Sequence, residues 1–282
     1  MLKKIRKSLT LKWMVFSILL ATIPLTIAGF SIIQIYQKDL KRSVIGTEEM
    51  KASMVVERTE AFFEKITSNL LTLANDEDFK MGSSSSHRKK LLELENLLYR
   101  NDYILELVLS DEKGRETIKV SKYKAMGPSD LKNQSKSEIF KVVSKNKTYY
   151  GNFKLMKDNV PAMEIAVAIK EYKGNPAGIL SAKINLRFLW NLLPQSQIGK
   201  KGFSYVVEND GTVIAHTDTR QALLRESLTR LPMVNQVIAG KEGSLEFDEP
   251  QGEKYLVVYK PIRELGWGVI VQVPVKEAYE PL

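Results

Sequence analysis

The stretch WMVFSILLATIPLTIAGFSIIQIY, residues 13–36, decides how this chain is organised. Its 24 residues include no Asp, Glu, Lys, Arg or His. A helix of that length rises by about 36 Å, which is enough to cross the hydrocarbon core of a bilayer. Five basic residues and no acid stand before it, so the positive-inside rule predicts that residues 1–12 are a cytoplasmic tail. Residues 37–282 are then predicted to lie in the periplasm or outside the cell.

A cleaved secretory signal is the alternative interpretation of this stretch. Such a signal has a shorter apolar region that ends at a cleavage site of small residues. Here the apolar run passes through Phe30 and Ile35 into Gln37 without an Ala-x-Ala pattern. The sequence therefore favours a retained transmembrane helix over residues 13–36, in the inner membrane of a bacterial cell.

The net charge of +9 does not indicate a nucleic-acid partner. Residues 1–36 hold five of the basic groups and no acid, so residues 37–282 carry 37 basic against 33 acidic groups, spread along the chain. A basic segment beside a membrane helix is better explained as an orientation signal that also contacts anionic lipids. The sequence has no cysteine, which excludes disulfides and cysteine-ligated zinc.

A long helix is predicted over residues 37–75. Its apolar residues form one stripe with helical spacing, made of Ile45, Ala52, Val56, Thr59, Phe63, Ile66, Leu70 and Leu73. Such a stripe packs either against the helix's own domain or against a second copy, as in a coiled coil. The distal half favours packing within the chain, whereas the membrane-near half fits either arrangement. We predict a homodimer through this helix.

Residues 76–193 combine helices and strands. The Ser-rich segment 81–87 precedes a predicted helix at 88–100 that a Ser residue caps, and a capping box at Ser135–Glu138 opens a short helix through Lys145. A further short helix is predicted at 187–193. Strands are predicted at 103–110, 116–120, 149–156, 163–170 and 178–186.

Residues 194–275 repeat this order of elements. Strands at 203–208 and 212–216 flank Asn209-Asp210-Gly211, which is a hairpin signal, and a helix with Pro232 in its first turn ends before Gly240. Three strands follow, at 244–247, 254–260 and 268–273. A hairpin, a helix and a three-strand meander occur twice, which predicts an α+β fold with two antiparallel modules, 76–193 and 194–275.

The sequence contains few residues of the types that usually carry out catalysis. The chain has two histidines, His87 and His216, and no metalloprotease, nucleophile-elbow or phosphate-loop motif. His87 stands in a Ser-rich loop and is expected to be solvated, and His216 is expected to form a hydrogen bond at the end of a strand. We predict no enzyme activity, no metal site and no cofactor for this chain.

Aromatic and charged residues of the first module fit a ligand pocket better. Tyr123, Tyr149, Tyr150, Phe153 and Lys183 are predicted to line one concave face of its sheet, with apolar walls and a few directional polar groups. The same tyrosines would also serve as ordinary half-buried strand residues. The residues alone do not decide between these two interpretations.

Two stretches of the second module resemble double Cache (dCache) sensor domains. They are GFSYVVENDGTVIAHTD, residues 202–218, and YLVVYKP, residues 255–261, followed by GWGVIVQVP, residues 266–274. In the first module, AGIL at 177–180 leads into Ile184-Asn185-Leu186 and is similar to the family's last distal strand. With the apolar stretch and the long helix in front, the resemblance covers residues 13–282.

The resemblance implies a membrane-rooted signalling helix at 37–75, a membrane-distal PAS-like module at 76–193 that holds the ligand, and a membrane-proximal PAS-like module at 194–275. Such domains belong to sensor histidine kinases, chemoreceptors and cyclic-nucleotide signalling enzymes. The segments Phe188-Leu189-Trp190 and 274–279 are most similar to the histidine kinases.

Amino-acid-binding members of this family carry acids where this chain has Asn152 and Lys183, so an ammonium group would lose its counter-charges here. The resemblance therefore implies an anionic small molecule such as a carboxylate, with Lys183 as its charge partner and Tyr150 and Asn152 as orienting groups. Residues 276–282 are expected to begin a link to a second membrane helix, so the chain is expected to be the sensor half of a longer receptor or a truncated product. A membrane-anchored enzyme and a non-signalling envelope adaptor are the alternative classes.

Overall fold

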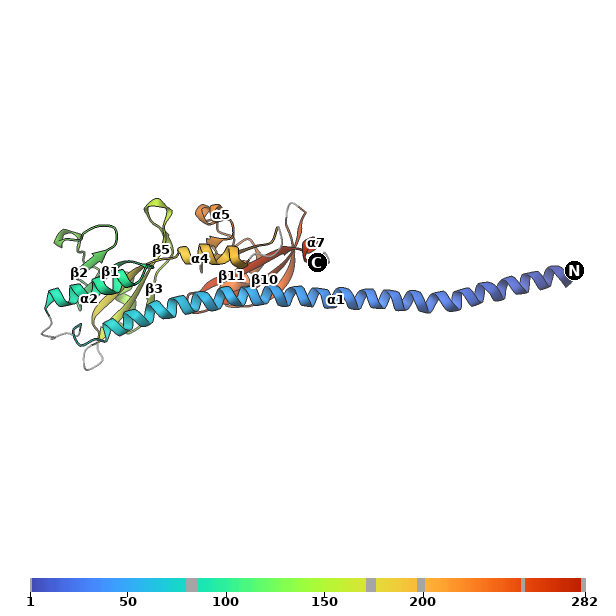
Figure 1. The fold of residues 1–282 in the computed structure, drawn as a ribbon, viewed down its shortest axis with the longest axis horizontal. Coiled ribbons are helices and arrows are strands. Elements are labelled where there is room, and N and C mark those ends of the chain that lie inside the picture. Colours follow the sequence, from blue (N-terminus) through green and yellow to red (C-terminus); the bar gives the residue numbers. More distant parts are fainter. Residues whose placement is uncertain (1, 80–85, 171–175, 197–200, 250–251, 280–282) are drawn as a thin grey trace.

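Helix α1 (Leu2–Ala74) is one continuous helix of 73 residues in the computed structural model. The structure describes residues 2–79, 86–170, 176–196, 201–249 and 252–279. The helix passes through Pro24 without interruption and runs from the apolar stretch along the whole folded part of the chain (Figure 1). The predicted long helix over residues 37–75 is confirmed, and it continues directly out of the apolar stretch.

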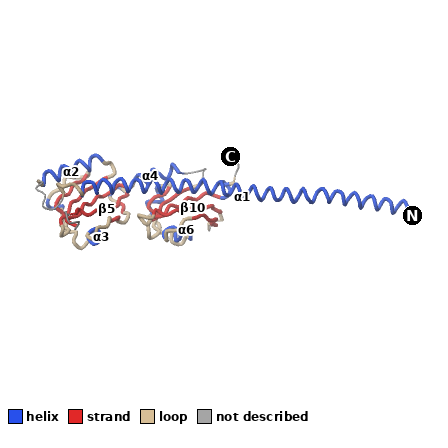
Figure 2. Tube along the Cα trace, turned by 90° about the horizontal axis from the view of Figure 1, so that it is seen from below, coloured by secondary structure: helices blue, strands red, loops and turns tan. Residues whose placement is uncertain are grey.

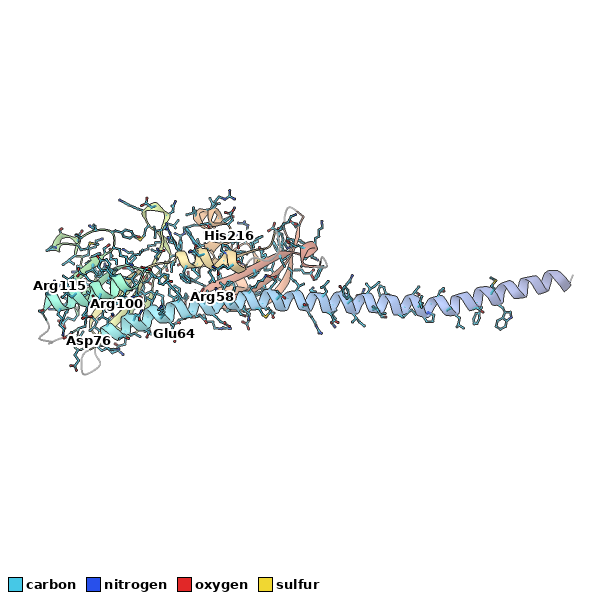
Figure 3. All side chains as sticks on the ribbon, in the orientation of Figure 1. Arg58, Glu64, Asp76, Arg100, Arg115 and His216 are labelled. Atoms are coloured by element: carbon cyan, nitrogen blue, oxygen red, sulfur yellow. The ribbon has the colours of Figure 1, made fainter. Side chains whose placement is uncertain are left out.

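The N-terminal part of α1 projects away from the rest of the chain (Figures 1 and 3). Its large apolar side chains are open to the surroundings, and Trp13, Leu25 and Phe30 are 64%, 76% and 66% exposed. In the described part of the chain, α1 is the one helix whose length and composition suit a bilayer crossing. A continuous apolar surface of this extent is compatible with lipid and not with water.

A buried stripe on the C-terminal half of α1 packs against the body of the protein. Ala52, Thr59, Phe63, Ile66 and Leu70 are all buried, which confirms the predicted packing of the distal half within the chain. Residues of two different sheets share one hydrophobic core with this stripe. The homodimer through the membrane-near half stays a prediction.

The sheet farther from the apolar end of α1, called the distal sheet, is antiparallel with the order β2-β1-β6-β5-β3, and β4 also pairs with β5. Helix α2 (His87–Arg100) precedes it and begins at the predicted Ser cap, because the Ser86 hydroxyl accepts a hydrogen bond from the Lys89 backbone N–H. The strands are β1 (Ile104–Asp111), β2 (Glu116–Ser121), β3 (Tyr149–Tyr150), β4 (Lys154–Leu155), β5 (Pro161–Lys170) and β6 (Pro176–Asn185).

Two expectations for the distal sheet differ from the structure. The strand predicted at 149–156 is split into β3 and β4, because the Phe153 N–H bonds to the Glu208 side chain in another part of the chain and not to β5. Helix α3 (Glu138–Val143) is capped by Ser137 and not by Ser135, because the Ser137 hydroxyl accepts from the N–H three residues ahead. Short 3₁₀ turns at Pro128–Asp130 and Lys157–Asn159 complete this part of the chain.

The sheet nearer to the apolar end, called the proximal sheet, is antiparallel with the order β8-β7-β11-β10-β9. Helix α4 (Arg187–Leu192) and a 3₁₀ turn at Leu193–Ser196 lead into it. Its elements are β7 (Phe203–Val207), β8 (Val213–His216), α5 (Thr219–Leu224), α6 (Pro232–Ile238), β9 (Gly243–Asp248), β10 (Lys254–Ile262), β11 (Trp267–Pro274) and α7 (Val275–Ala278). The expected hairpin, helix and meander are all present, whereas the six-residue helix α5 was not expected.

Both sheets use their two faces in the same way. Helix α1 covers one face of each sheet, and the short helices α3 and α6 lie on the opposite side (Figure 2). The packing of α6 is close, since a Cβ added at Gly268 of β11 would come within 2.2 Å of Val237. The mixed α+β fold with two antiparallel sheets is therefore confirmed, and each sheet has an outer face turned away from α1.

Candidate functional site

A cavity of about 350 Å³, called the distal cavity, opens on the outer face of the distal sheet. Side chains alternate along a strand, so Leu107, Ile165 and Ala182 enter the core with α1 while their neighbours point to the cavity. Its volume is within the range of pockets for small metabolites. The lining consists of Glu106, Val108, Glu116, Lys119, Lys132, Gln134, Tyr149, Gly151, Asn152, Lys154, Leu155, Met156, Ala162, Met163, Glu164 and Lys183.

Two lysines in this cavity converge on one carboxylate. The Nζ of Lys183 donates to Oε1 of Glu106 at 3.1 Å, and the Nζ of Lys119 lies 3.2 Å from the same oxygen. Sheet register explains the contact, because Glu106 and Lys183 are directly paired on β1 and β6. Lys183 also faces Glu164 on β5. Opposite charges on neighbouring strands therefore hold these side chains at the sheet surface.

Glu116 on β2 forms hydrogen bonds that hold segment 132–134, one wall of the cavity, against the sheet. Its side chain is 2% exposed and accepts hydrogen bonds from the backbone N–H of Lys132 at 2.9 Å and from the amide of Gln134 at 3.1 Å. The Nζ of Lys119 lies 3.8 Å from Oε2, the oxygen that also accepts from Lys132. A buried carboxylate with several donors is well satisfied, so segment 132–134 has a fixed position over β2.

Positive charge exceeds negative charge in the lining by one lysine, since four lysines and three glutamates face the cavity. Lys132, Lys154 and Glu164 form no ion pair within the described residues. Burial, with a smaller contribution from Glu164, raises the pKa of the Tyr149 hydroxyl, which keeps it a neutral donor. The cavity thus offers ammonium groups, one unpaired carboxylate and a phenol.

The structure brings three of the six predicted ligand residues together. Tyr149, Asn152 and Lys183 all line the distal cavity. Tyr123 does not line it, because it follows the end of β2 and is 59% exposed. Tyr150 does not line it either, because consecutive residues of a strand face opposite sides and Tyr149 takes the cavity side.

The histidines behave as expected. His87 is exposed at the first position of α2, and the Nδ1 of His216 accepts a hydrogen bond from the Asp218 backbone N–H at 2.9 Å. Within the residues that the structure describes, His, Asp and Glu side chains form no cluster suited to a metal ion.

A family model for the Cache domain, dCache_1, matches residues 35–282. The chain belongs to this Cache-domain family. Several solved structures share the fold. The extracellular domain of the putative histidine kinase mmHK1S-Z2 is 16% identical, with a TM-score of 0.65 over 82% of this chain and 98% of that one. The sensory domain of the Campylobacter jejuni chemoreceptor Tlp3, with isoleucine bound, is 13% identical, with a TM-score of 0.67 over 86% and 97%. The ligand-binding domain of Mlp24 with asparagine is 14% identical, with a TM-score of 0.58 over 85% and 97%.

In this Cache domain, the segment 149–155 has a second face that contacts α1 and the proximal module. The Tyr150 hydroxyl donates to Oε1 of Glu264 at 3.0 Å and lies 3.3 Å from the hydroxyl of Thr67 on α1. The Phe153 backbone N–H donates to Oε1 of Glu208 at 2.7 Å. The same short segment therefore borders the cavity on one side and the neighbouring module on the other.

Arg225 completes this junction. Its guanidinium lies 5.1 Å from the centre of the Phe153 ring and 3.8 Å from the Glu208 carboxylate. Arg225 directly follows α5 and has a positive φ of 51°. Burial raises the pKa of Glu208, and the hydrogen bond from Phe153 opposes that shift. Phe153 was predicted as a cavity residue, but it is buried in the core on this opposite side.

Sequence reasoning missed the charged residues on β1, β2 and β5. Glu106, Glu116, Lys119 and Glu164 line the cavity of this Cache domain, and none was proposed from the sequence. The sequence did contain an indication of them: in the strand YILELVLS, residues 103–110, one acid interrupts an apolar run. A charge at such a position indicates either a strand face that meets a polar cavity or an ion-paired partner on the next strand.

Proposed function

We propose that this chain is the extracytoplasmic sensing region of a bacterial transmembrane receptor, with a histidine kinase as its output. In this proposal a small anionic metabolite, such as a carboxylate, binds in the distal cavity. The observation that carries it is the pair of ammonium groups, Lys119 and Lys183, which share Oε1 of Glu106. Because the two ammonium groups share one carboxylate oxygen, a ligand carboxylate beside Lys183 would give its N–H donors a further acceptor.

Asn152 and Tyr149 would orient such a ligand. The Asn152 amide lines the cavity and forms no hydrogen bond within the described ranges, so it is free to bind a carboxylate. A zwitterionic amino acid is the competing ligand, because Glu164 offers a carboxylate for an ammonium group. The Tlp3 and Mlp24 structures contain isoleucine and asparagine.

The signal would leave the cavity through segment 149–155. A ligand that moves Asn152 or Tyr149 also moves Tyr150 and Phe153, because these residues are consecutive. Their contacts with Thr67 and Glu208 pass the displacement to α1 and to the proximal module. A ligand shifts such an equilibrium only by its difference in affinity for the two states. Helix α1 would carry the change across the inner membrane, with residues 1–12 in the cytoplasm and a second copy paired along its membrane-near half.

Isothermal titration of the full chain in lipid nanodiscs tests the ligand class. Succinate and citrate would represent carboxylates, and valine and asparagine would represent amino acids. We expect carboxylate binding that Lys183→Gln weakens by about tenfold or more. The matched control is Lys170→Gln, an exposed lysine at the end of β5 outside the cavity lining, which should leave binding unchanged. Tight amino-acid binding that survives Lys183→Glu would refute the anionic ligand.

The output is tested by the coding sequence that follows the Leu282 codon. An in-frame membrane helix followed by a kinase module would support the histidine kinase. A methyl-accepting module there would replace the kinase with a chemoreceptor.

A further inference from the structure

A second cavity, of about 680 Å³, lies on the outer face of the proximal sheet and is called the proximal cavity. It has the same place in its module as the distal cavity, because β7, β8, β10 and β11 follow the order of β1, β2, β5 and β6. The lining consists of Phe203, Tyr205, Val213, His216, Asp218, Gln221, Glu226, Leu228, Arg230, Leu231, Phe247, Glu249, Tyr255 and Gln272.

Aromatic rings form one wall of this cavity. The ring of Phe203 is stacked on that of His216 with centroids 5.3 Å apart and on that of Tyr205 with centroids 6.2 Å apart. Tyr255 meets Phe203 edge to face, at 5.8 Å. His216 can be located in Figure 3 within the proximal module. Near-parallel rings of this kind offer a flat apolar surface to which another flat ring can stack.

One buried polar group on this wall has no partner in the described part of the chain. Tyr205 is 1% exposed and its hydroxyl forms no hydrogen bond. Gln272, on the neighbouring strand β11, is 3% exposed and lines the same cavity. Buried polar groups are almost always paired, so the unpaired hydroxyl on the cavity wall indicates a partner that enters from the cavity.

One negative charge in the lining is uncompensated. Asp218 pairs with Arg220, and Glu226 pairs with Arg230 at 2.6 Å. The Glu249 carboxylate has no ion pair within the described ranges. The Tyr205 hydroxyl and the Glu249 carboxylate line the same cavity. Burial raises the pKa of the Tyr205 hydroxyl, and the nearby Glu249 adds to that shift, so the hydroxyl stays neutral.

We propose that the proximal module carries a second ligand site, for a flat heteroaromatic ring that bears a positively charged amino group. The ring stacks on Phe203 and His216, its polar edge exchanges hydrogen bonds with Tyr205 and Gln272, and its ammonium group pairs with Glu249. This site goes beyond the proposed function, which places one anionic ligand in the distal module. It does not depend on that proposal, because the two cavities share no lining residue.

The test uses the full chain in nanodiscs and three probes. Tryptamine has the ring and the positive charge, indole-3-acetate has the same ring with a negative charge, and hexylamine has the charge without a ring. We expect isothermal titration to show tryptamine binding at least about tenfold tighter than that of either other probe. Equal binding of tryptamine and indole-3-acetate, or no tryptamine binding up to about 5 mM, would overturn the proposal.

Two variants assign the site to the proposed residues. Tyr205→Phe should weaken tryptamine about three- to tenfold and also raise the unfolding temperature of the ligand-free protein by about 2–4 °C, because the unpaired hydroxyl is gone. Glu249→Gln should weaken tryptamine by a similar factor and remove its preference over indole-3-acetate.

Matched controls keep the two cavities distinguishable. Tyr259→Phe makes the same change on the same sheet but outside the lining. It should leave tryptamine binding unchanged and should not raise the unfolding temperature. Lys183→Gln should leave tryptamine binding intact. Loss of tryptamine binding in Lys183→Gln, or unchanged binding in Tyr205→Phe and Glu249→Gln, would refute the proximal site.

Discussion

Replacing Glu208 tests the junction between the two modules most directly. The residue is 4% exposed, its Oε1 accepts the Phe153 N–H at 2.7 Å, and its Oε2 lies 3.8 Å from Arg225. In Glu208→Ala the buried N–H of Phe153 loses its acceptor, which costs about 1–3 kcal/mol. Arg225 loses its counter-charge, which adds about 1 kcal/mol at most, because the guanidinium is partly exposed. We expect the free energy of unfolding to fall by about 1–4 kcal/mol.

Glu208→Gln separates the hydrogen bond from the charge. The glutamine keeps an acceptor for the Phe153 N–H, so its cost at neutral pH should stay within about 1 kcal/mol. Because burial raises the pKa of Glu208, the folded wild type binds more protons than the unfolded chain between the two pKa values. Its stability therefore falls as the pH rises through that interval, and Glu208→Gln should remove this fall.

Urea unfolding in one detergent, from about pH 4 to about pH 8, measures both effects. The matched control is Glu242→Ala, an exposed acid ahead of β9, which should change the free energy of unfolding by no more than about 0.5 kcal/mol. A Glu208→Ala variant as stable as the Glu242→Ala control would refute the reasoning. So would an unchanged pH dependence in Glu208→Gln.

Three further substitutions test the packing and the electrostatics. Gly268→Ala places a Cβ 2.2 Å from Val237, so α6 must shift on β11, and urea unfolding should show a loss of about 1–3 kcal/mol. Phe63 is 1% exposed and lies where α1 meets both modules. Phe63→Ala leaves a cavity there and should lower the free energy of unfolding by about 3–5 kcal/mol in the same assay. A loss below about 1 kcal/mol would contradict the shared core. Burial lowers the pKa of His216, so the unfolding temperature of the wild type should drop as the pH falls below about 6.5. The unfolding temperature of His216→Gln should drop less over the same pH range. Equal slopes for the two proteins would contradict this assignment.

Strand alternation allowed most of the fold to be predicted. On β6, the apolar residues Leu180, Ala182 and Ile184 alternate in the sequence with the polar residues Ser181 and Lys183, and the structure places the apolar set in the core. Alternation is a local property of the chain, so it needs no knowledge of the neighbouring strands. Helix α5 escaped notice because six residues are too few for a helical period to show.

The candidate site could be predicted only in part, because its chemistry depends on contacts that are distant in sequence. The partner of Lys183 is Glu106, which is 77 residues away and is brought near by the register of β1 and β6. Tyr150 shows a different limit. Alternation puts it on the side opposite Tyr149, but only the position of Thr67 on α1 and of Glu264 in the other module explains what it does there.

The unbroken course of α1 also determines the angular phase between the membrane and the two sheets. Each residue turns an α-helix by about 100°, so one residue inserted between 37 and 44 would rotate the apolar stretch by that angle relative to both cavities. An insertion of seven residues would restore the orientation to within about 20° while moving the sheets about 10 Å farther from the membrane. In chimeras that join this sensor to another membrane segment, signalling is therefore expected to recur each time the junction is lengthened by seven residues. Comparing insertions of one and of seven residues would separate the effect of rotation from the effect of distance.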